Sequence, residues 1–219
     1  MKLYGISGLG ADKRVFDYLT LNCEFIPVEW IKPKRKESIE EYSLRLSTVI
    51  DKKEEFGILG VSFGGLVATE ISKILKPKLT ILISSAETRK ELRLLFRGIG
   101  KLGLINRLPA RMFNPPRRIA NFLFGTSKKE LLNQILNDTD LNFARWAVNK
   151  LVTWKNEKKL VGCFKIHGTK DKLIPPRKTN NMILIEGGEH FMIVDRADEI
   201  SKIINEKIKN DTIIKSKKL

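Results

Sequence analysis

The sequence predicts an α/β fold built on a mostly parallel sheet. Short runs rich in Val, Ile, Leu and Phe alternate with amphipathic stretches, and this alternation favours repeated strand–helix units. Several runs are apolar at almost every position, as in residues 79–83, which is typical of strands buried on both faces of a parallel sheet. The expected strands are residues 2–7, 23–31, 56–61, 79–84, 161–168 and 182–186.

Three helices are expected between and after these strands. Ser38, with Glu41 three residues later, forms a capping-box pattern that predicts a helix from Ser38 to about Asp51. A second helix is expected after Ser62, where apolar residues recur three and four positions apart. A third begins near Asp195 and carries a row of isoleucines.

One long segment interrupts the alternation of strands and helices. About 75 residues of helical character separate the strand that ends near Ser85 from the strand that begins at Val161. A structureless loop of this length is uncommon in a compact domain. The sequence therefore predicts an α/β core of residues 1–86 and 161–219, with a helical cap or lid inserted at residues 87–160.

The composition excludes several classes of protein. The chain has 219 residues, of which 42% are hydrophobic and 30% charged, as in ordinary folded domains. With two cysteines, two histidines and no phosphate-binding or dinucleotide motif, we expect no metal and no cofactor. No apolar run reaches the ~20 residues of a membrane span and the first residues do not form a signal peptide, so we expect a cytoplasmic protein.

The net charge of +16 is concentrated in one segment. Residues 87–129 hold 11 basic and two acidic side chains. No nucleic-acid-binding motif accompanies this charge, so no nucleic-acid partner is expected. Residues 92–102 mix large apolar side chains with spaced cations, and three interpretations stay open: peripheral contact with an anionic membrane, attraction of an anionic substrate, or solvation of a helix surface.

Residues 60–64 read G-V-S-F-G and match the pattern G-x-S-x-G. They follow an apolar run directly and precede an amphipathic helix, which is the strand–turn–helix setting of a nucleophile elbow. Glycines at both ends let the backbone turn tightly, and the start of a helix directs N–H groups towards a negative oxygen. Ser62 is therefore the candidate nucleophile.

With this elbow the sequence resembles the α/β-hydrolase superfamily, whose triads run in the order nucleophile, acid, histidine. Residues 167–175 read HGTKDKLIP and resemble the family's H-G-x-x-D-x-x-x-P segment, which implies that Asp171 is the acid. Residues 187–191 read GGEHF and resemble its G-x-x-H loop, which implies that His190 is the general base.

The resemblance also implies an oxyanion hole. Residues 7–10 read SGLG and stand where the family usually has H-G-x-x. The backbone N–H groups of Leu9 and Phe63 are the implied donors to the oxyanion. Ser7 departs from the family's usual histidine, which leaves the backbone donor in place but changes the hydrogen bonds of the loop.

The positions of these residues agree with one another independently of any family. Leu9, Ser62, Asp171 and His190 each lie just past the end of a different expected strand. In a parallel sheet these ends share one edge, where ligands bind in open α/β folds. A serine hydroxyl needs a base to remove its proton, and that base needs a carboxylate to orient it.

Three other residues have competing interpretations. His167 precedes the acid at a strand end and is interpreted as a structural histidine. Glu87, after the strand that ends near Ser85, is an alternative position for the acid. Trp146 lies on an expected helix, where packing is favoured and substrate contact is the alternative.

The function predicted from these patterns is hydrolysis by a serine hydrolase. It would cleave an ester, thioester or similar acyl bond of a small-molecule substrate, with anionic and lipid-like substrates both open, through an acyl-enzyme on Ser62. Two alternatives remain: acyl transfer to an acceptor other than water, and ligand binding without catalysis on the same scaffold.

Overall fold

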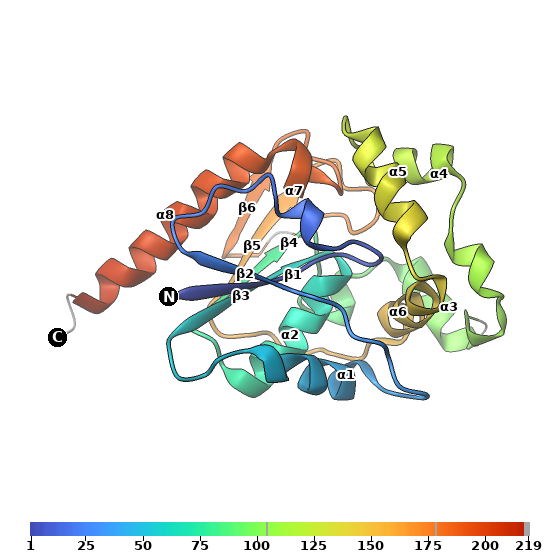
Figure 1. The fold of residues 1–219 in the computed structure, drawn as a ribbon, viewed down its shortest axis with the longest axis horizontal. Helices are drawn as coiled ribbons and strands as arrows, with labels where there is room; N and C mark the ends of the chain where they lie inside the picture. Colours follow the sequence, from blue (N-terminus) through green and yellow to red (C-terminus); the bar gives the residue numbers. More distant parts are fainter. Residues whose placement is uncertain (104, 178, 217–219) are drawn as a thin grey trace.

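A computed structural model describes residues 1–103, 105–177 and 179–216. Its centre is a six-stranded sheet of order β2-β1-β3-β4-β5-β6, in which every neighbouring pair is parallel (Figure 1). The strands are β1 (Lys2–Ile6), β2 (Glu24–Val28), β3 (Phe56–Val61), β4 (Leu79–Ile83), β5 (Cys163–Gly168) and β6 (Met182–Ile185). The expected α/β fold with a mostly parallel sheet of about six strands is confirmed.

Strand lengths follow the pairing. The run expected at 23–31 forms only β2. Val28 is the last residue of this run that pairs with β1, opposite Ile6 at the end of that strand, and the residues after Val28 have no neighbouring strand. The run expected to begin at 161 enters the sheet at Cys163, after Gly162 turns the chain with a φ of 76°.

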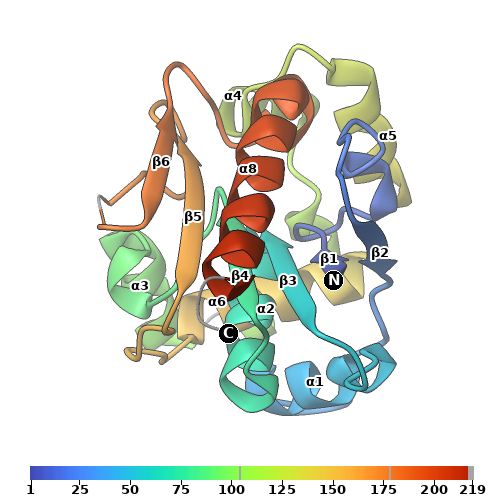
Figure 2. The same cartoon turned by 90° about the vertical axis from the view of Figure 1, so that its left-hand side faces the viewer.

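Helices cover both faces of the sheet. Helices α1 (Ile39–Leu46) and α2 (Phe63–Leu75) lie below it in Figure 1, whereas α7 (Met192–Asp195) and α8 (Ala197–Ser216) lie above it. Figure 2 shows α8 crossing in front of the strands. Each face carries its own buried hydrophobic cluster, so the strands are covered on both sides as their continuous apolarity predicted.

The capping box at the start of α1 forms as predicted. The Ser38 hydroxyl accepts the Glu41 N–H at 3.1 Å, and the Glu41 carboxylate accepts the Ser38 N–H at 2.8 Å. The helix is shorter than expected, because the chain tightens into a 3₁₀ turn over Ser47–Val49 instead of continuing to Asp51.

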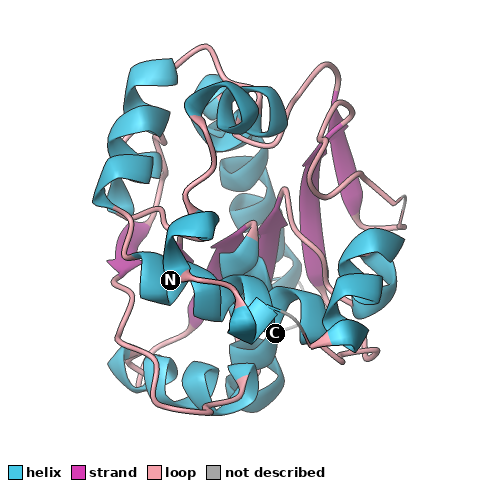
Figure 3. Ribbon diagram, turned by 90° about the vertical axis from the view of Figure 1, so that its right-hand side faces the viewer, coloured by secondary structure: helices cyan, strands magenta, loops and turns pink. Residues whose placement is uncertain are grey.

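Between β4 and β5 the described residues form four α-helices, the first of which has short 3₁₀ turns before and after it. They are α3 (Leu94–Leu102), α4 (Arg117–Phe124), α5 (Lys129–Asp138) and α6 (Leu141–Thr153). They lie together beyond the carboxyl ends of the strands, at the right of Figure 1 and facing the viewer in Figure 3. Their action as a separate cap stays a prediction. Among the described residues, no helix combines the length and apolarity needed to cross a membrane.

The two ends of this helical segment are held side by side. The Arg89 N–H donates to the Asn156 carbonyl at 2.7 Å, and the Asn156 side chain donates to the Glu87 carbonyl at 2.8 Å. The Leu160 N–H donates to the Glu87 carboxylate at 2.5 Å. The chain therefore leaves the sheet and returns to it at one place, which we call the neck.

A buried lysine lies beneath the neck. Lys165, on β5, is only 1% exposed, and its ammonium forms an ion pair with Glu91 and lies 4.0 Å from the Glu87 carboxylate. Burial raises the pKa of the Glu87 carboxyl above its ordinary value, against the opposing hydrogen bond from Leu160 and the charge of Lys165. The lysine thus compensates two largely buried carboxylates.

Replacing Lys165 with Met should therefore destabilise the fold strongly. Breaking a buried ion pair leaves an uncompensated charge and typically costs about 3–5 kcal/mol. Urea denaturation of Lys165→Met should show this loss, whereas Lys52→Met, at an exposed position, should unfold like the wild type. Equal midpoints for the two variants would contradict the role of Lys165.

Candidate active site

Ser62 occupies a strained turn between β3 and α2. Its φ is 52° and its ψ is −122°, a conformation that side-chain-bearing residues rarely adopt. A Cβ added at Gly64 would clash with the backbone carbonyls of Ile6 and Ser7, and one added at Gly60 would clash with Gly65. Both glycines of the G-x-S-x-G pattern are thus required, because other backbone segments approach Gly60 and Gly64 too closely for a side chain to fit.

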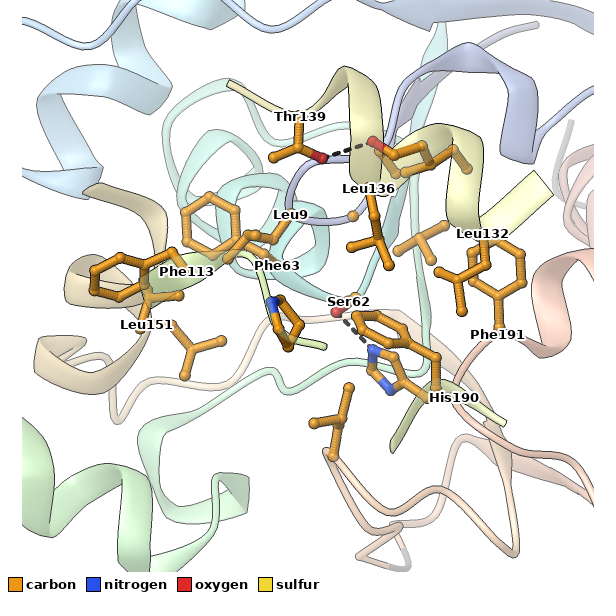
Figure 4. Close-up of a pocket in the computed structure, with 18 of the residues that line it drawn as sticks. Leu9, Ser62, Phe63, Phe113, Leu132, Leu136, Thr139, Leu151, His190 and Phe191 are labelled. Atoms are coloured by element: carbon orange, nitrogen blue, oxygen red, sulfur yellow. Dashed lines mark hydrogen bonds between the residues drawn. The ribbon is translucent and has the colours of Figure 1, made fainter. Parts of the chain in front are cut away.

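The structure brings three of the predicted residues into one hydrogen-bonded chain. The Ser62 Oγ lies 2.8 Å from His190 Nε2, as Figure 4 shows, and His190 Nδ1 lies 2.8 Å from Asp171 Oδ2. A carboxylate can only accept, so His190 holds its proton on Nδ1 when neutral and turns the lone pair of Nε2 towards the serine hydroxyl. The serine hydroxyl then donates to His190.

Asp171 is fixed by more than its histidine. Its Oδ1 accepts the backbone N–H groups of Leu173 and Ile174, each at 2.9 Å. His167 Nε2 lies 3.3 Å from Asp171 Oδ2 and 2.5 Å from the Ile174 carbonyl oxygen. His167 therefore contacts the acid and its loop. Burial opposes ionisation, but His190, His167 and the Ile174 N–H together hold the pKa of Asp171 below its ordinary value.

This lowered pKa predicts a pH effect on stability. Between the folded-state pKa and the unfolded value of 3.8, Asp171 is ionised when folded and protonated when unfolded. The carboxylate therefore stabilises the fold at higher pH, and this contribution is lost as the pH falls below about 4 towards the folded-state pKa. In acid titrations followed by denaturant unfolding, the wild type should lose stability more steeply below pH ~4 than Asp171→Asn. Parallel curves would contradict this.

The two implied oxyanion donors lie beside the serine. Leu9 and Phe63 both line the same cavity as Ser62. Phe63 is the first residue of α2, so its N–H has no carbonyl four residues earlier within the helix. The N–H of Ser62 itself donates to the Ile83 carbonyl at 3.0 Å and is thus already used. The Ser7 hydroxyl donates to the Ala11 carbonyl at 2.8 Å, so the residue that replaces the usual histidine closes the loop around Leu9.

Ser62 and His190 open into an apolar cavity of about 310 Å³ (Figure 4). Polar side chains such as Thr139 and Asn114 contribute little beside the aliphatic and aromatic ones. The wall includes Phe96, Phe124, Leu132, Leu136, Leu151 and Phe191. Most of these come from α3 to α6, so the helical segment supplies much of the wall.

Two candidate residues lie elsewhere. Trp146 is absent from the described cavity wall: its ring packs on Tyr42, Phe63 and Phe143, with centroids 4.5–6.0 Å apart. Its position favours packing over substrate contact. Glu87 lies at the neck with Leu160 and Lys165, and the carboxylate on His190 is that of Asp171.

Sequence reasoning missed the cavity wall and the charge cluster beneath the neck. The wall residues are ordinary apolar helix positions, with no local signal to separate them from core. Lys165 did carry a signal, because it is a lysine within a strand, β5, whose other residues are apolar apart from His167. In the described parts of the chain, no group of three or more His, Cys, Asp or Glu side chains is placed to hold a metal ion.

Several solved structures share this fold. A thermophilic esterase from Thermogutta terrifontis has a TM-score of 0.73 at 12% identity, covering 96% of this chain and 90% of that chain. MenH from S. aureus has a TM-score of 0.71 at 18% identity, covering 97% and 94%. The RedJ thioesterase from the prodiginine pathway of Streptomyces coelicolor has a TM-score of 0.68 at 13% identity, covering 94% and 89%.

These similarities show the fold. The chain has the α/β-hydrolase fold, as the resemblance of its motifs implied. No protein-family model matches its sequence, and no curated protein matches it either.

Proposed function

We propose that this chain is a serine hydrolase that cleaves an ester or thioester of an apolar acyl group through an acyl-enzyme on Ser62. The observation that carries the proposal is the hydrogen-bonded chain from Ser62 through His190 to Asp171 at the wall of an apolar cavity. The names of two structural neighbours, an esterase and a thioesterase, agree with this chemistry.

The geometry supports a two-stage reaction. His190 Nε2 takes the proton of Ser62 as Oγ attacks the acyl carbonyl carbon, and the ionised Asp171 stabilises the imidazolium that forms. The N–H groups of Leu9 and Phe63 stabilise the tetrahedral oxyanion. His190 then returns the proton to the leaving oxygen or sulfur, which departs and leaves the acyl group on Ser62. Water, deprotonated by His190, then attacks the acyl carbonyl carbon. The bond from this carbon to Ser62 Oγ breaks, His190 returns the proton to Oγ, and the acid is released.

The cavity indicates the acyl group. Its volume of about 310 Å³ is near the lower end of the ~300–1,000 Å³ usual for small-molecule sites. Burial of apolar surface contributes about 0.8 kcal/mol per methylene, so each added carbon should strengthen binding until the cavity is full. We therefore expect medium-length or aromatic acyl groups to be preferred over acetyl.

The test combines a fluorophosphonate probe with p-nitrophenyl esters of increasing chain length. The probe should label Ser62, and kcat/KM should rise with chain length and then fall once the chain exceeds the cavity. Addition of alcohol or thiol acceptors to the same assay would reveal acyl transfer as a competing activity. Absence of labelling in the folded protein would favour ligand binding without catalysis.

Narrowing the cavity should shorten the preferred chain. Leu136 lies on the cavity wall near Ser62 (Figure 4), and Leu136→Trp would fill part of the space. Loss of about 1–3 kcal/mol of binding predicts a decrease of roughly 5–150-fold in kcat/KM for a decanoyl ester, with little change for acetyl. Leu44→Trp, at an exposed site on α1, is the matched control. Equal effects on both esters would contradict this assignment of the wall.

A further inference from the structure

Large apolar side chains project into solvent from the helical segment. Leu94 and Leu95 on α3 are 69% and 66% exposed, and Ile119 and Phe122 on α4 are 50% and 65% exposed. Met112, in the turn between these helices, is 60% exposed. Scattered exposed leucines need no explanation, but apolar side chains gathered around one feature do.

That feature is the opening of the apolar cavity. Met112 is exposed and also lines the cavity, so it marks a place where the cavity reaches the surface. Phe96 follows Leu95 directly and lines the same cavity, as does Phe124, two residues after Phe122. The exposed apolar side chains of α3 and α4 are therefore neighbours in sequence of the residues that border the cavity.

Helices α3 and α4 and the turns between them also carry basic side chains, with no acidic residue near them in the sequence. Residues 92–129 contain no Asp or Glu. Arg93, Arg97, Arg111 and Arg118 make no ion pair with the residues that the structure describes. The two acids that precede them, Glu87 and Glu91, are buried and contact Lys165. This surface is thus basic as well as apolar.

Helix α3 packs closely on α6. A Cβ added at Gly100 would clash with the Val152 carbonyl on α6, so the glycine allows the two helices to pack closely. At Gly98 an added Cβ would meet no atom within 4 Å, so that side of α3 is open. We define the docking face as the exposed apolar residues Leu94, Leu95, Met112, Ile119 and Phe122 together with Arg93, Arg97, Arg111 and Arg118.

We infer that the docking face binds an anionic lipid surface and presents the opening of the cavity to it. The apolar side chains would enter the acyl region while the arginines contact the lipid headgroups, as in helices that lie in a membrane interface. That the lipid surface supplies the acyl substrate rests on the proposed function. That the docking face binds lipid does not depend on that function. Two copies of this face would repel each other, because each would bring unpaired arginines and no acid.

The test is co-sedimentation of the full chain with vesicles. Ser62→Ala protein is used so that no lipid is consumed, and the vesicles are phosphatidylcholine alone or mixed with phosphatidylglycerol. Binding is expected only to the mixed vesicles and should weaken with salt. Since each cation near an anionic surface is worth about 1 kcal/mol, Arg93→Gln with Arg97→Gln should lower the partition coefficient roughly 25-fold. Leu94→Ser with Leu95→Ser should lower it at least about 10-fold.

The matched control removes the same charge elsewhere. Lys52→Gln with Lys53→Gln, in the exposed loop before β3, should leave vesicle binding unchanged. Equal loss of binding in this control would overturn the inference, because general positive charge would then explain it. So would failure of the parent protein to bind mixed vesicles, or a dimer in sedimentation equilibrium that Leu94→Ser with Leu95→Ser abolishes.

Failure of this inference is distinguishable from failure of the proposed function. If vesicle binding is absent but the probe still labels Ser62 in the wild type, only the binding to a lipid surface is contradicted. If the protein binds vesicles but the probe does not label Ser62, only the proposed hydrolase activity is contradicted.

Discussion

Replacement of Ser62 with Ala should abolish turnover of p-nitrophenyl esters, lowering kcat by about 10⁶-fold, and should abolish labelling by a fluorophosphonate. The physical reason is that the proposed acyl-enzyme would form on the Ser62 Oγ, which lies within hydrogen-bond distance of His190 Nε2, at 2.8 Å. The oxyanion hole and the cavity would remain, so a small residual rate over water is expected.

Folding must be shown to survive this change. Ala adds no atom to the elbow, so the thermal midpoint of Ser62→Ala should stay near that of the wild type. Ser43→Ala is a matched control, because the buried Ser43 hydroxyl has no hydrogen-bond partner among the described residues. It should keep full activity. Turnover near the wild-type rate in folded Ser62→Ala would contradict the proposal that this chain is a serine hydrolase.

Asp171→Asn should lower kcat by about 10⁴-fold while the fold is kept. An amide can donate to His190 Nδ1, which favours the tautomer whose proton faces Ser62 and prevents His190 from acting as base. The amide oxygen can still accept the N–H groups of Leu173 and Ile174, which hold the loop at 2.9 Å in the wild type. Steady-state kinetics, with urea denaturation to verify folding, would measure both effects.

Glu87→Gln is the control for the acid. Glu87 lies at the neck and takes no part in the chain from His190 to Ser62, so this variant should keep nearly wild-type kcat. A large loss in Glu87→Gln together with a small loss in Asp171→Asn would reassign the acid to the end of β4.

Local patterns predicted the parts of the site that depend on a few adjacent residues. The elbow around Ser62 follows from glycines and an apolar strand within one short segment, and the capping box at Ser38 is equally local. The positions of Asp171 and His190 at one sheet edge could be predicted because parallel strands align their carboxyl ends. Their mutual distance of 2.8 Å could not, since it depends on loops after two different strands.

The remaining features depend on contacts between distant segments. The order β2-β1-β3 places β1 in the interior of the sheet, and no pattern within β1 itself encodes this neighbour choice. Trp146 could have faced either the cavity or an aromatic cluster, because both neighbourhoods are apolar and periodicity does not distinguish them. The partners of Lys165 lie 74 and 78 residues earlier, at Glu91 and Glu87, so only the folded chain reveals them.

The neck has a consequence for how this protein can vary. Direct hydrogen bonds join the outgoing and the returning chain at Arg89, Asn156, Glu87 and Leu160. The segment between them is therefore a loop whose two ends are held a fixed distance apart at the edge of the sheet. Each doubling of such a loop costs only about 0.6 kcal/mol of closure entropy. Changes in the length of this segment are therefore cheap in closure entropy, whereas exchange of its helices would also remove buried side chains of the core clusters, such as Phe143 and Trp154. Under the proposed function, the acyl selectivity would then change through the wall residues of this segment, such as Leu136, while the elbow at Ser62 is kept.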